Sequence, residues 1–170
     1  MPSFPSIPAL PRYRLLFICL GNICRSPAAE GVMNHLVKQA GLQNTITCDS
    51  AGTIDYHSGK PADPRMARAA SRRDIPLTSR SRPVTPADFS NFDLLLTMDA
   101  SNYRDVLAMA PDGDARRKVI PMLHFSDTPD AGVPDPYYGG ERGFEEVLDL
   151  LQNACTNLLE TLQKNIEHAS

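Results

Sequence analysis

The chain has 170 residues, of which 42% are hydrophobic and 22% are charged, as is ordinary for one soluble domain with a sizeable core. Its formal net charge of −3 argues against a nucleic-acid-binding or membrane-surface protein. No apolar stretch near the N-terminus is long enough to cross a bilayer, and four irregularly spaced cysteines are too few for a secreted disulfide framework, so we expect a cytoplasmic protein with reduced thiols and neither nucleic-acid nor membrane partners.

Residues 1–12 contain a proline at every third position, from Pro2 to Pro11. This spacing is typical of a loose polyproline-like segment without packed secondary structure. We therefore expect a proline-rich flexible tail over 1–12 and one folded domain over 13–170.

Apolar runs and helical periodicity then alternate along the chain. Buried strands are predicted at 13–19, 45–52, 92–99 and 118–123, and helices at 26–40, 63–74, 100–110 and 143–166. This alternation predicts an α/β fold, a single domain with a four-stranded parallel sheet and helices on both faces. Ligands of such sheets bind beyond the carboxyl ends of the strands, where Cys19, Ser50 and Asp99 lie.

The stretch "CLGNICRS", residues 19–26, joins the first predicted strand to the first predicted helix. Gly21 and Asn22 readily adopt positive φ, so the loop can point successive N–H groups inward and form an anion nest, a phosphate-binding loop after the first strand. Arg25 suits two phosphate oxygens, and together with the positive end of the helix it favours the thiolate of Cys19. Ser26 is placed to donate a hydrogen bond to the sulfur. The alternative is that Cys19 is only a small buried residue.

A thiolate beside a phosphate site is a nucleophile for phosphoryl transfer, and that reaction also needs an acid for the leaving group. The candidate is Asp135 in "PDPYYGG", where two flanking prolines restrict the backbone. An ordinary surface turn is the alternative interpretation of this segment.

Together these residues resemble the low-molecular-weight protein tyrosine phosphatase family. The resemblance runs from about Tyr13 to the terminal helix and includes "CLGNICRS", "DSAGT" at 49–53, "DPR" at 63–65, "MDASNYRDV" at 98–106 and "DPYYG" at 135–139. It implies a phosphomonoester hydrolase without metal or cofactor that acts on tyrosine-phosphorylated proteins, with inorganic phosphate as product and inhibitor.

The resemblance also implies roles for individual residues. Cys19 would attack phosphorus and form a phosphocysteine, while Arg25 would bind the phosphoryl oxygens and Asp135 would act as general acid and base. The loop residues Leu20, Gly21, Asn22, Ile23 and Cys24 would bind the phosphoryl group through their amides. Ser26 would support the thiolate, and Asn22 and Ser50 would hold the shape of the loop. The slot for the substrate ring would be lined by Ile23, Tyr56, Tyr137 and Tyr138.

One position departs from the family pattern: Ser79 stands where many members carry a histidine that helps hold the loop asparagine. The resemblance favours Cys24 as a redox partner of Cys19, the alternative being a packing residue. Cys48 and Cys155 are expected to be core residues.

Other functions remain open on the sequence alone. An arsenate reductase on the same scaffold is the nearest alternative, but such enzymes use further cysteines and no cysteine lies between Cys48 and Cys155. A catalytically silent phosphotyrosine-binding module is a second, and a nucleotide-binding P-loop is excluded because no Gly-Lys-Ser/Thr follows the glycine. The arginine-rich stretch 65–82 predicts a solvated helix face with structural ion pairs; attraction of acidic phosphopeptides is the alternative.

Overall fold

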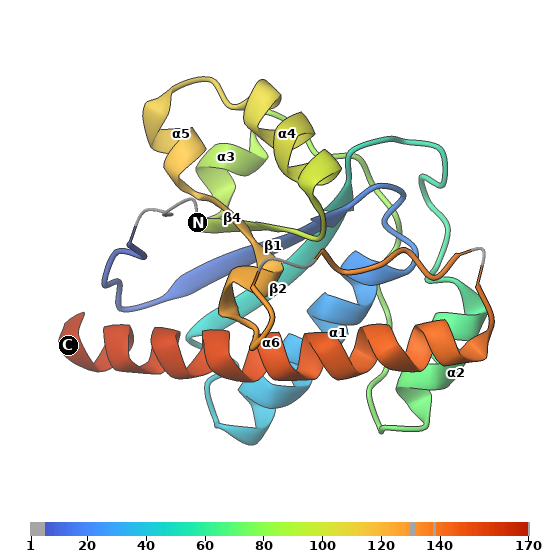
Figure 1. The fold of residues 1–170 in the computed structure, drawn as a ribbon. Coiled ribbons are helices and arrows are strands. Elements are labelled where there is room, and N and C mark those ends of the chain that lie inside the picture. Colours follow the sequence, from blue (N-terminus) through green and yellow to red (C-terminus); the bar gives the residue numbers. More distant parts are fainter. Residues whose placement is uncertain (1–5, 130–131, 138, 170) are drawn as a thin grey trace.

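A computed structural model describes residues 6–129, 132–137 and 139–169 (Figure 1). All four strands are parallel and lie in the order β2-β1-β3-β4. The predicted α/β fold with a four-stranded parallel sheet is therefore confirmed. In chain order the elements are β1 Tyr13–Cys19, α1 Arg25–Gln39, β2 Ile46–Gly52, α2 Pro64–Ser71, α3 Asp88–Asn91, β3 Leu94–Thr97, α4 Ala100–Met109, α5 Gly113–Arg117, β4 Val119–Pro121, the 3₁₀ helix Met122–Phe125 and α6 Glu141–Ala169.

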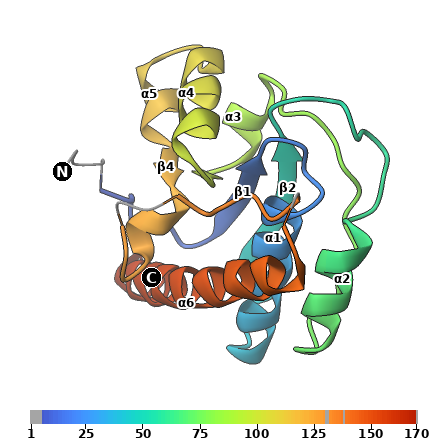
Figure 2. The ribbon, with the colours of Figure 1, turned by 45° about the vertical axis from the view of Figure 1, so that its right-hand side comes forward.

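Helices cover both faces of the sheet, as predicted. Figures 1 and 2 show α1, α2 and α6 on one side and α3, α4 and α5 on the other. Alternate residues of β1 supply the two cores: Leu15 and Phe17 belong to the cluster with α1 and α6, whereas Leu16 and Ile18 belong to the cluster with α3, α4 and α5. Because β1 is buried on both faces, its sequence is a nearly continuous apolar run.

The long helix α6 closes the first face. Its buried side chains recur at helical spacing and pack against α1, α2 and the 3₁₀ helix. They are Phe144, Val147, Leu148, Leu151, Ala154, Cys155, Leu158, Leu159 and Leu162. None of the helices within the described residues is both long enough and apolar enough to span a bilayer.

The strand register brings the candidate residues to one edge of the sheet. Cys19 pairs with Gly52 at the end of β1 and β2, and Ile18 pairs with Thr97 at the end of β3. Since β1 lies between these two strands, its carboxyl end is flanked by both of theirs. The chain segments that leave the three strands therefore meet at one point beyond the sheet.

Several element boundaries differ from the sequence prediction. The third strand begins only at Leu94, and the fourth ends at Pro121, which has no N–H to extend the ladder and is followed by a 3₁₀ turn. The short helices α3 and α5 were not predicted, because four or five residues are too few to show helical periodicity.

The described part of the N-terminal segment contacts the folded domain. Residues 6–12 form no helix or strand, but Ile7 and Leu10 pack against the core. The Tyr13 hydroxyl donates to the Pro8 carbonyl oxygen at 2.5 Å and accepts from the Leu10 N–H at 3.1 Å. Two partly buried apolar side chains and the hydrogen bonds of the Tyr13 hydroxyl thus connect these residues to the domain, while residues 1–5 lie outside the described part.

Candidate active site

The loop after β1 surrounds the sulfur of Cys19. The Cys19 side chain ends β1 and lies 3.0 Å from the Ser26 hydroxyl oxygen, at hydrogen-bond distance. Its sulfur also accepts the Asn22 N–H at 3.3 Å. The Asn22 N–H, together with the Ser26 hydroxyl when it donates, stabilises negative charge on the sulfur. Cys19 is only 2% exposed, yet it lines a cavity that opens to solvent.

Asn22 gives the loop its curvature. Its φ is 56°, in the left-handed region that asparagine tolerates better than most residues. The Asn22 side chain donates to the Ser26 hydroxyl oxygen at 2.7 Å, and its carbonyl oxygen accepts the backbone N–H of Arg82 at 3.1 Å. The Ser81 hydroxyl donates to the Gly21 carbonyl oxygen at 3.0 Å. The segment 81–82, from the connection between α2 and α3, therefore holds the loop in its strained shape.

The expected support from Ser50 needs correction. The Ser50 hydroxyl donates at 2.6 Å to the carboxylate of Glu30 on α1, so its hydrogen bond goes to the helix that follows the loop. Burial raises the pKa of Glu30 above its ordinary value, while hydrogen bonds from Ser50 and Ser79 oppose that rise. Ser79 thus joins a cluster with Glu30 and Ser50, and the Asn22 contact goes instead to the Arg82 backbone.

Arg25 is the first residue of α1 and is buried against the segment after β3. Its guanidinium donates to the Asp99 carboxylate at 2.6 Å and to the Val133 carbonyl oxygen at 3.1 Å. Asp99 also accepts the Asn102 N–H and so caps α4. A guanidinium has five N–H donors in a fixed plane, so these two contacts orient it and leave other donors for a bound anion.

Asp135 lies across the cavity mouth from Cys19. Its carboxylate accepts the Tyr137 N–H at 3.1 Å and lies 3.6 Å from the second terminal nitrogen of Arg25. The side chain is 42% exposed, so its carboxylate is open to solvent at the cavity mouth. The predicted residues Cys19, Arg25 and Asp135 are thus brought to a single site, although 110 and more residues separate Asp135 from the other two in the sequence.

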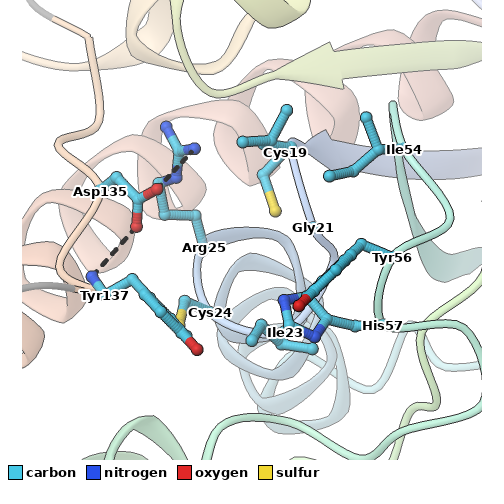
Figure 3. Close-up of a pocket in the computed structure, with 11 residues that line it drawn as sticks. Cys19, Gly21, Ile23, Cys24, Arg25, Ile54, Tyr56, His57, Asp135 and Tyr137 are labelled. Carbon is cyan, nitrogen blue, oxygen red and sulfur yellow. Dashed lines mark hydrogen bonds and ion pairs between the residues drawn. The ribbon is translucent and has the colours of Figure 1, made fainter.

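These residues line an open cavity of about 290 Å³. Figure 3 shows the Cys19 sulfur between two walls, with Arg25, Asp135 and Tyr137 on one side and Ile54, Tyr56 and His57 on the other. Of the predicted ring-slot residues, Ile23, Tyr56 and Tyr137 line the cavity, together with Leu20, Gly21 and Cys24. Tyr138 lies outside the described residues.

Sequence reasoning missed two residues of the far wall, Ile54 and His57. The His57 ring lies 4.8 Å from that of Tyr56, centroid to centroid, and a Cβ added to Gly21 would come within 3.0 Å of it. Glycine at position 21 therefore lets the histidine pack on the loop backbone. Both residues could have been found from their positions in the sequence, because Ile54 directly follows "DSAGT" and His57 directly follows the predicted slot residue Tyr56.

The "DPR" motif connects the two halves of the site. Asp63 donates its N–H to the Ile23 carbonyl oxygen at 2.8 Å and caps α2 by accepting the Arg65 N–H. The Arg65 side chain pairs with the Asp63 carboxylate and donates to the Tyr137 carbonyl oxygen at 2.8 Å. These hydrogen bonds from Arg65 lower the pKa of Asp63, so the pair stays ionised at neutral pH. One ion pair thus fixes both the loop around Cys19 and the segment that carries Asp135.

The other cysteines differ from Cys19 in their surroundings. Burial, assisted by the nearby charges of Asp63 and Cys19, raises the pKa of Cys24 to about 12. Burial also raises the pKa of both Cys48 and Cys155, which belong to the core on the α6 side or pack against it. A sulfur that lines the cavity, supported by two hydrogen-bond partners and facing an arginine and a carboxyl group, can displace a leaving group from a bound anion.

Comparisons with known proteins agree with this geometry. The family model described as low molecular weight phosphotyrosine protein phosphatase matches residues 14–168. The chain belongs to this family. A Synechocystis relative is 51% identical over 154 residues, which are 90% of this chain and 98% of its own. The human low molecular weight phosphotyrosine protein phosphatase is 37% identical over 147 residues, covering 86% and 93% of the two chains. A crystal structure of protein tyrosine phosphatase from Entamoeba histolytica superimposes with a TM-score of 0.86 at 46% identity, covering 89% of this chain and 97% of the other.

Family membership confirms the resemblance that the motifs predicted. The protein is accordingly an enzyme of the low molecular weight protein-tyrosine-phosphatase class. The motifs that carried the resemblance also explain much of the site. "CLGNICRS" forms the loop, and "DPR" connects that loop to the segment with Asp135. "MDASNYRDV" supplies the Asp99 carboxylate that holds Arg25.

Proposed function

We propose that the protein hydrolyses phosphotyrosine in tyrosine-phosphorylated proteins through a phosphocysteine on Cys19. The observation that carries this proposal is the convergence of Cys19, Arg25 and Asp135 on one cavity. Each occupies the position that its step requires: nucleophile at the floor, cation beside it and acid at the mouth.

In the first step the loop N–H groups and Arg25 bind the phosphoryl oxygens. The Cys19 thiolate attacks phosphorus, forming the P–S bond as the P–O bond to the tyrosine breaks. Asp135 donates its proton to the leaving phenolate oxygen, because a phenolate leaves more readily once protonated.

In the second step Asp135, now a carboxylate, removes a proton from a water molecule. That water attacks phosphorus, the P–S bond breaks, and the thiolate and inorganic phosphate are released. The product then competes with substrate for the same loop, so inorganic phosphate acts as an inhibitor. Every proton and leaving group is accounted for by this chain and water, so the reaction needs neither metal nor cofactor.

The substrate ring is bound between aromatic and aliphatic side chains. Tyr56 and Tyr137 come from opposite walls of the cavity, with Ile23 between them (Figure 3). Flat apolar surfaces on both sides favour an aryl ester over the shorter alkyl ester of phosphoserine. The family resemblance implies the same role for Tyr138, which lies outside the described residues.

We further propose that Cys24 protects Cys19 from oxidation in a cytoplasmic setting. Peroxide converts the Cys19 thiolate to a sulfenic acid, and the Cys24 thiol condenses with it, forming a disulfide and releasing water. A dithiol reductant then restores both thiols by exchange. Both residues line the cavity, which supports this pairing.

The proposal is tested by comparing rates on a phosphotyrosine peptide, a phosphoserine peptide and arsenate with purified protein. Phosphotyrosine hydrolysis should be the fastest, and Cys19→Ser should abolish it while phosphate still binds. Arsenate reduction that exceeds phosphotyrosine hydrolysis, or hydrolysis by the Cys19→Ser variant, would contradict the proposal.

A further inference from the structure

Three large apolar side chains remain exposed in the described part of the chain, and all three surround the mouth of the catalytic cavity. Leu20 and Ile54 are each 41% exposed and Tyr56 is 77% exposed. We call these three residues the apolar rim. Apolar side chains that gather in one place on a surface mark an interaction site more often than scattered ones do.

The apolar rim has a fixed backbone. Beyond the last β1–β2 pair, Cys19 with Gly52, the Thr53 N–H donates to the Cys19 carbonyl oxygen at 3.0 Å and the Ile54 N–H donates to the Leu20 carbonyl oxygen at 3.1 Å. A Cβ on Gly52 would lie 2.7 Å from that same Leu20 oxygen, so glycine is needed for this close approach. Leu20 and Ile54 are therefore neighbours held in place before any ligand arrives, which reduces the entropy lost on binding.

The chemical steps leave part of this surface unused. The proposed acid and the Tyr137 side of the ring slot lie on the opposite wall from Ile54 and Tyr56 (Figure 3). A free phosphotyrosine would fill the space between the walls. In a protein substrate, however, the residues next to the phosphotyrosine must lie against the surface around the mouth.

The charges nearby select against an acidic neighbour. Asp55 is exposed between Ile54 and Tyr56 and would repel one. Four of the six arginines in 65–82 that were candidates to attract acidic peptides form ion pairs within the chain: Arg65 with Asp63, Arg72 and Arg73 with Glu145, and Arg82 with Asp49 and Asp88. The predicted structural ion pairs in this stretch are thus confirmed.

We propose that the apolar rim binds an aliphatic or aromatic side chain adjacent to the phosphotyrosine of the substrate protein. This inference rests on the proposed function and adds the class of substrate. The rim makes the enzyme selective for phosphotyrosines in apolar local sequence.

The test uses three peptides that share one phosphotyrosine and differ only in its two immediate neighbours, which are leucine, alanine or glutamate. The wild-type kcat/KM should be ~5–10-fold higher for the leucine peptide than for the alanine peptide, the range expected when about half of a leucine side chain leaves water. The glutamate peptide should be the poorest substrate because Asp55 repels it.

A variant and a matched control test whether the preference for the leucine peptide arises at the apolar rim. Ile54→Ala should reduce the leucine-to-alanine ratio of kcat/KM to ~2–3, since it removes one of the two aliphatic contacts and about half of the free energy behind the preference. Ile7→Ala makes the same change in the N-terminal segment, beside the amino ends of β3 and β4, and should keep the wild-type ratio. Each ratio compares two peptides on one protein, so a difference in the amount of folded enzyme cancels.

Two results would overturn the inference while leaving the proposed function intact: equal kcat/KM for all three peptides, or a ratio that Ile54→Ala leaves unchanged. A preference for the glutamate peptide would overturn it in favour of an electrostatic rim. Failure to hydrolyse any of the three peptides would contradict the proposed function itself.

Discussion

The ion pair with Asp99 orients the Arg25 guanidinium in the site, and removing the charge of Asp99 tests this role. Asp99→Asn keeps the size of the side chain and keeps a good N-cap residue on α4, so the helix should start as before. What changes is the oxygen 2.6 Å from the Arg25 guanidinium, which becomes a neutral amide oxygen. The guanidinium is 4% exposed, so water cannot replace the lost charge fully.

The magnitude follows from the kind of hydrogen bond that is replaced. A hydrogen bond to a charged partner contributes about 1.5–3 kcal/mol and a neutral one about 0.5–1.5 kcal/mol. Because Asp99 is 31% exposed, the difference belongs at the lower end, about 1–1.5 kcal/mol. We therefore expect kcat/KM for p-nitrophenyl phosphate to fall ~5–15-fold as Arg25 becomes less well oriented.

Asp99 also occupies an Arg25 donor that a phosphoryl group could use, and competition for that donor would make Asp99→Asn more active. The geometry decides against it: Asp99 takes one terminal nitrogen, while the other terminal nitrogen points toward Asp135 at the cavity mouth. Orientation should outweigh competition, so inorganic phosphate should also inhibit the variant more weakly.

The assay is steady-state hydrolysis with inhibition by phosphate, and the control is Asp114→Asn. Asp114 pairs with Arg117 on the surface, where such pairs contribute ~0–1 kcal/mol, so this variant should stay within about twofold of wild type. Tighter phosphate binding or a higher kcat/KM in Asp99→Asn would refute the reasoning, because Asp99 would then be a competitor of the substrate.

Three further predictions concern Asp135, Cys24 and Glu30. Asp135→Ala should lower kcat by ~10²–10⁴ on phenolic esters and by less on esters with an acidic leaving group, and a uniform loss across leaving groups would remove Asp135 from the acid role. Cys24→Ser should keep much of the basal activity, but after peroxide treatment dithiothreitol should not restore it; full recovery, or mass mapping of Cys19 bridged to another cysteine, would make Cys24 a packing residue. Because burial raises the pKa of Glu30, the folded state holds its proton more tightly than the unfolded chain does, and this contribution to stability is present below the unfolded pKa and is lost as pH rises through the folded one. Glu30→Gln should therefore gain thermal stability relative to wild type as pH rises from 4 to 8, and parallel melting-temperature curves for the two proteins would disprove it.

Residues close together in the sequence were the easiest to predict. Cys19, Asn22, Arg25 and Ser26 belong to one strand–loop–helix junction, and glycine, asparagine and serine there have local backbone reasons for their positions. Asp135 was predicted because the reaction needs an acid for the leaving group, the loop contains none, and the family motif "DPYYG" includes an aspartate.

Contacts that depend on tertiary structure were missed or misassigned. The Arg82 backbone N–H that holds Asn22 has no sequence signature, since any residue except proline offers that group. Ser50 was expected to hold the shape of the loop, but its hydroxyl donates to Glu30 of α1, the helix that follows the loop. Asp99 was placed at the correct edge of the sheet, yet its pairing with Arg25 depends on how the ends of β1 and β3 meet.

The central claim, a phosphocysteine on Cys19, is tested most directly by trapping it. Protein mixed with p-nitrophenyl phosphate should be quenched in acid during turnover, digested and mapped by mass spectrometry. We predict one added phosphoryl group on the peptide that contains Cys19, more of it in Asp135→Ala with this acidic leaving group because its hydrolysis step lacks a base, and none in Cys19→Ser. A phosphoryl group on another residue, or active turnover with none on Cys19, would contradict the account.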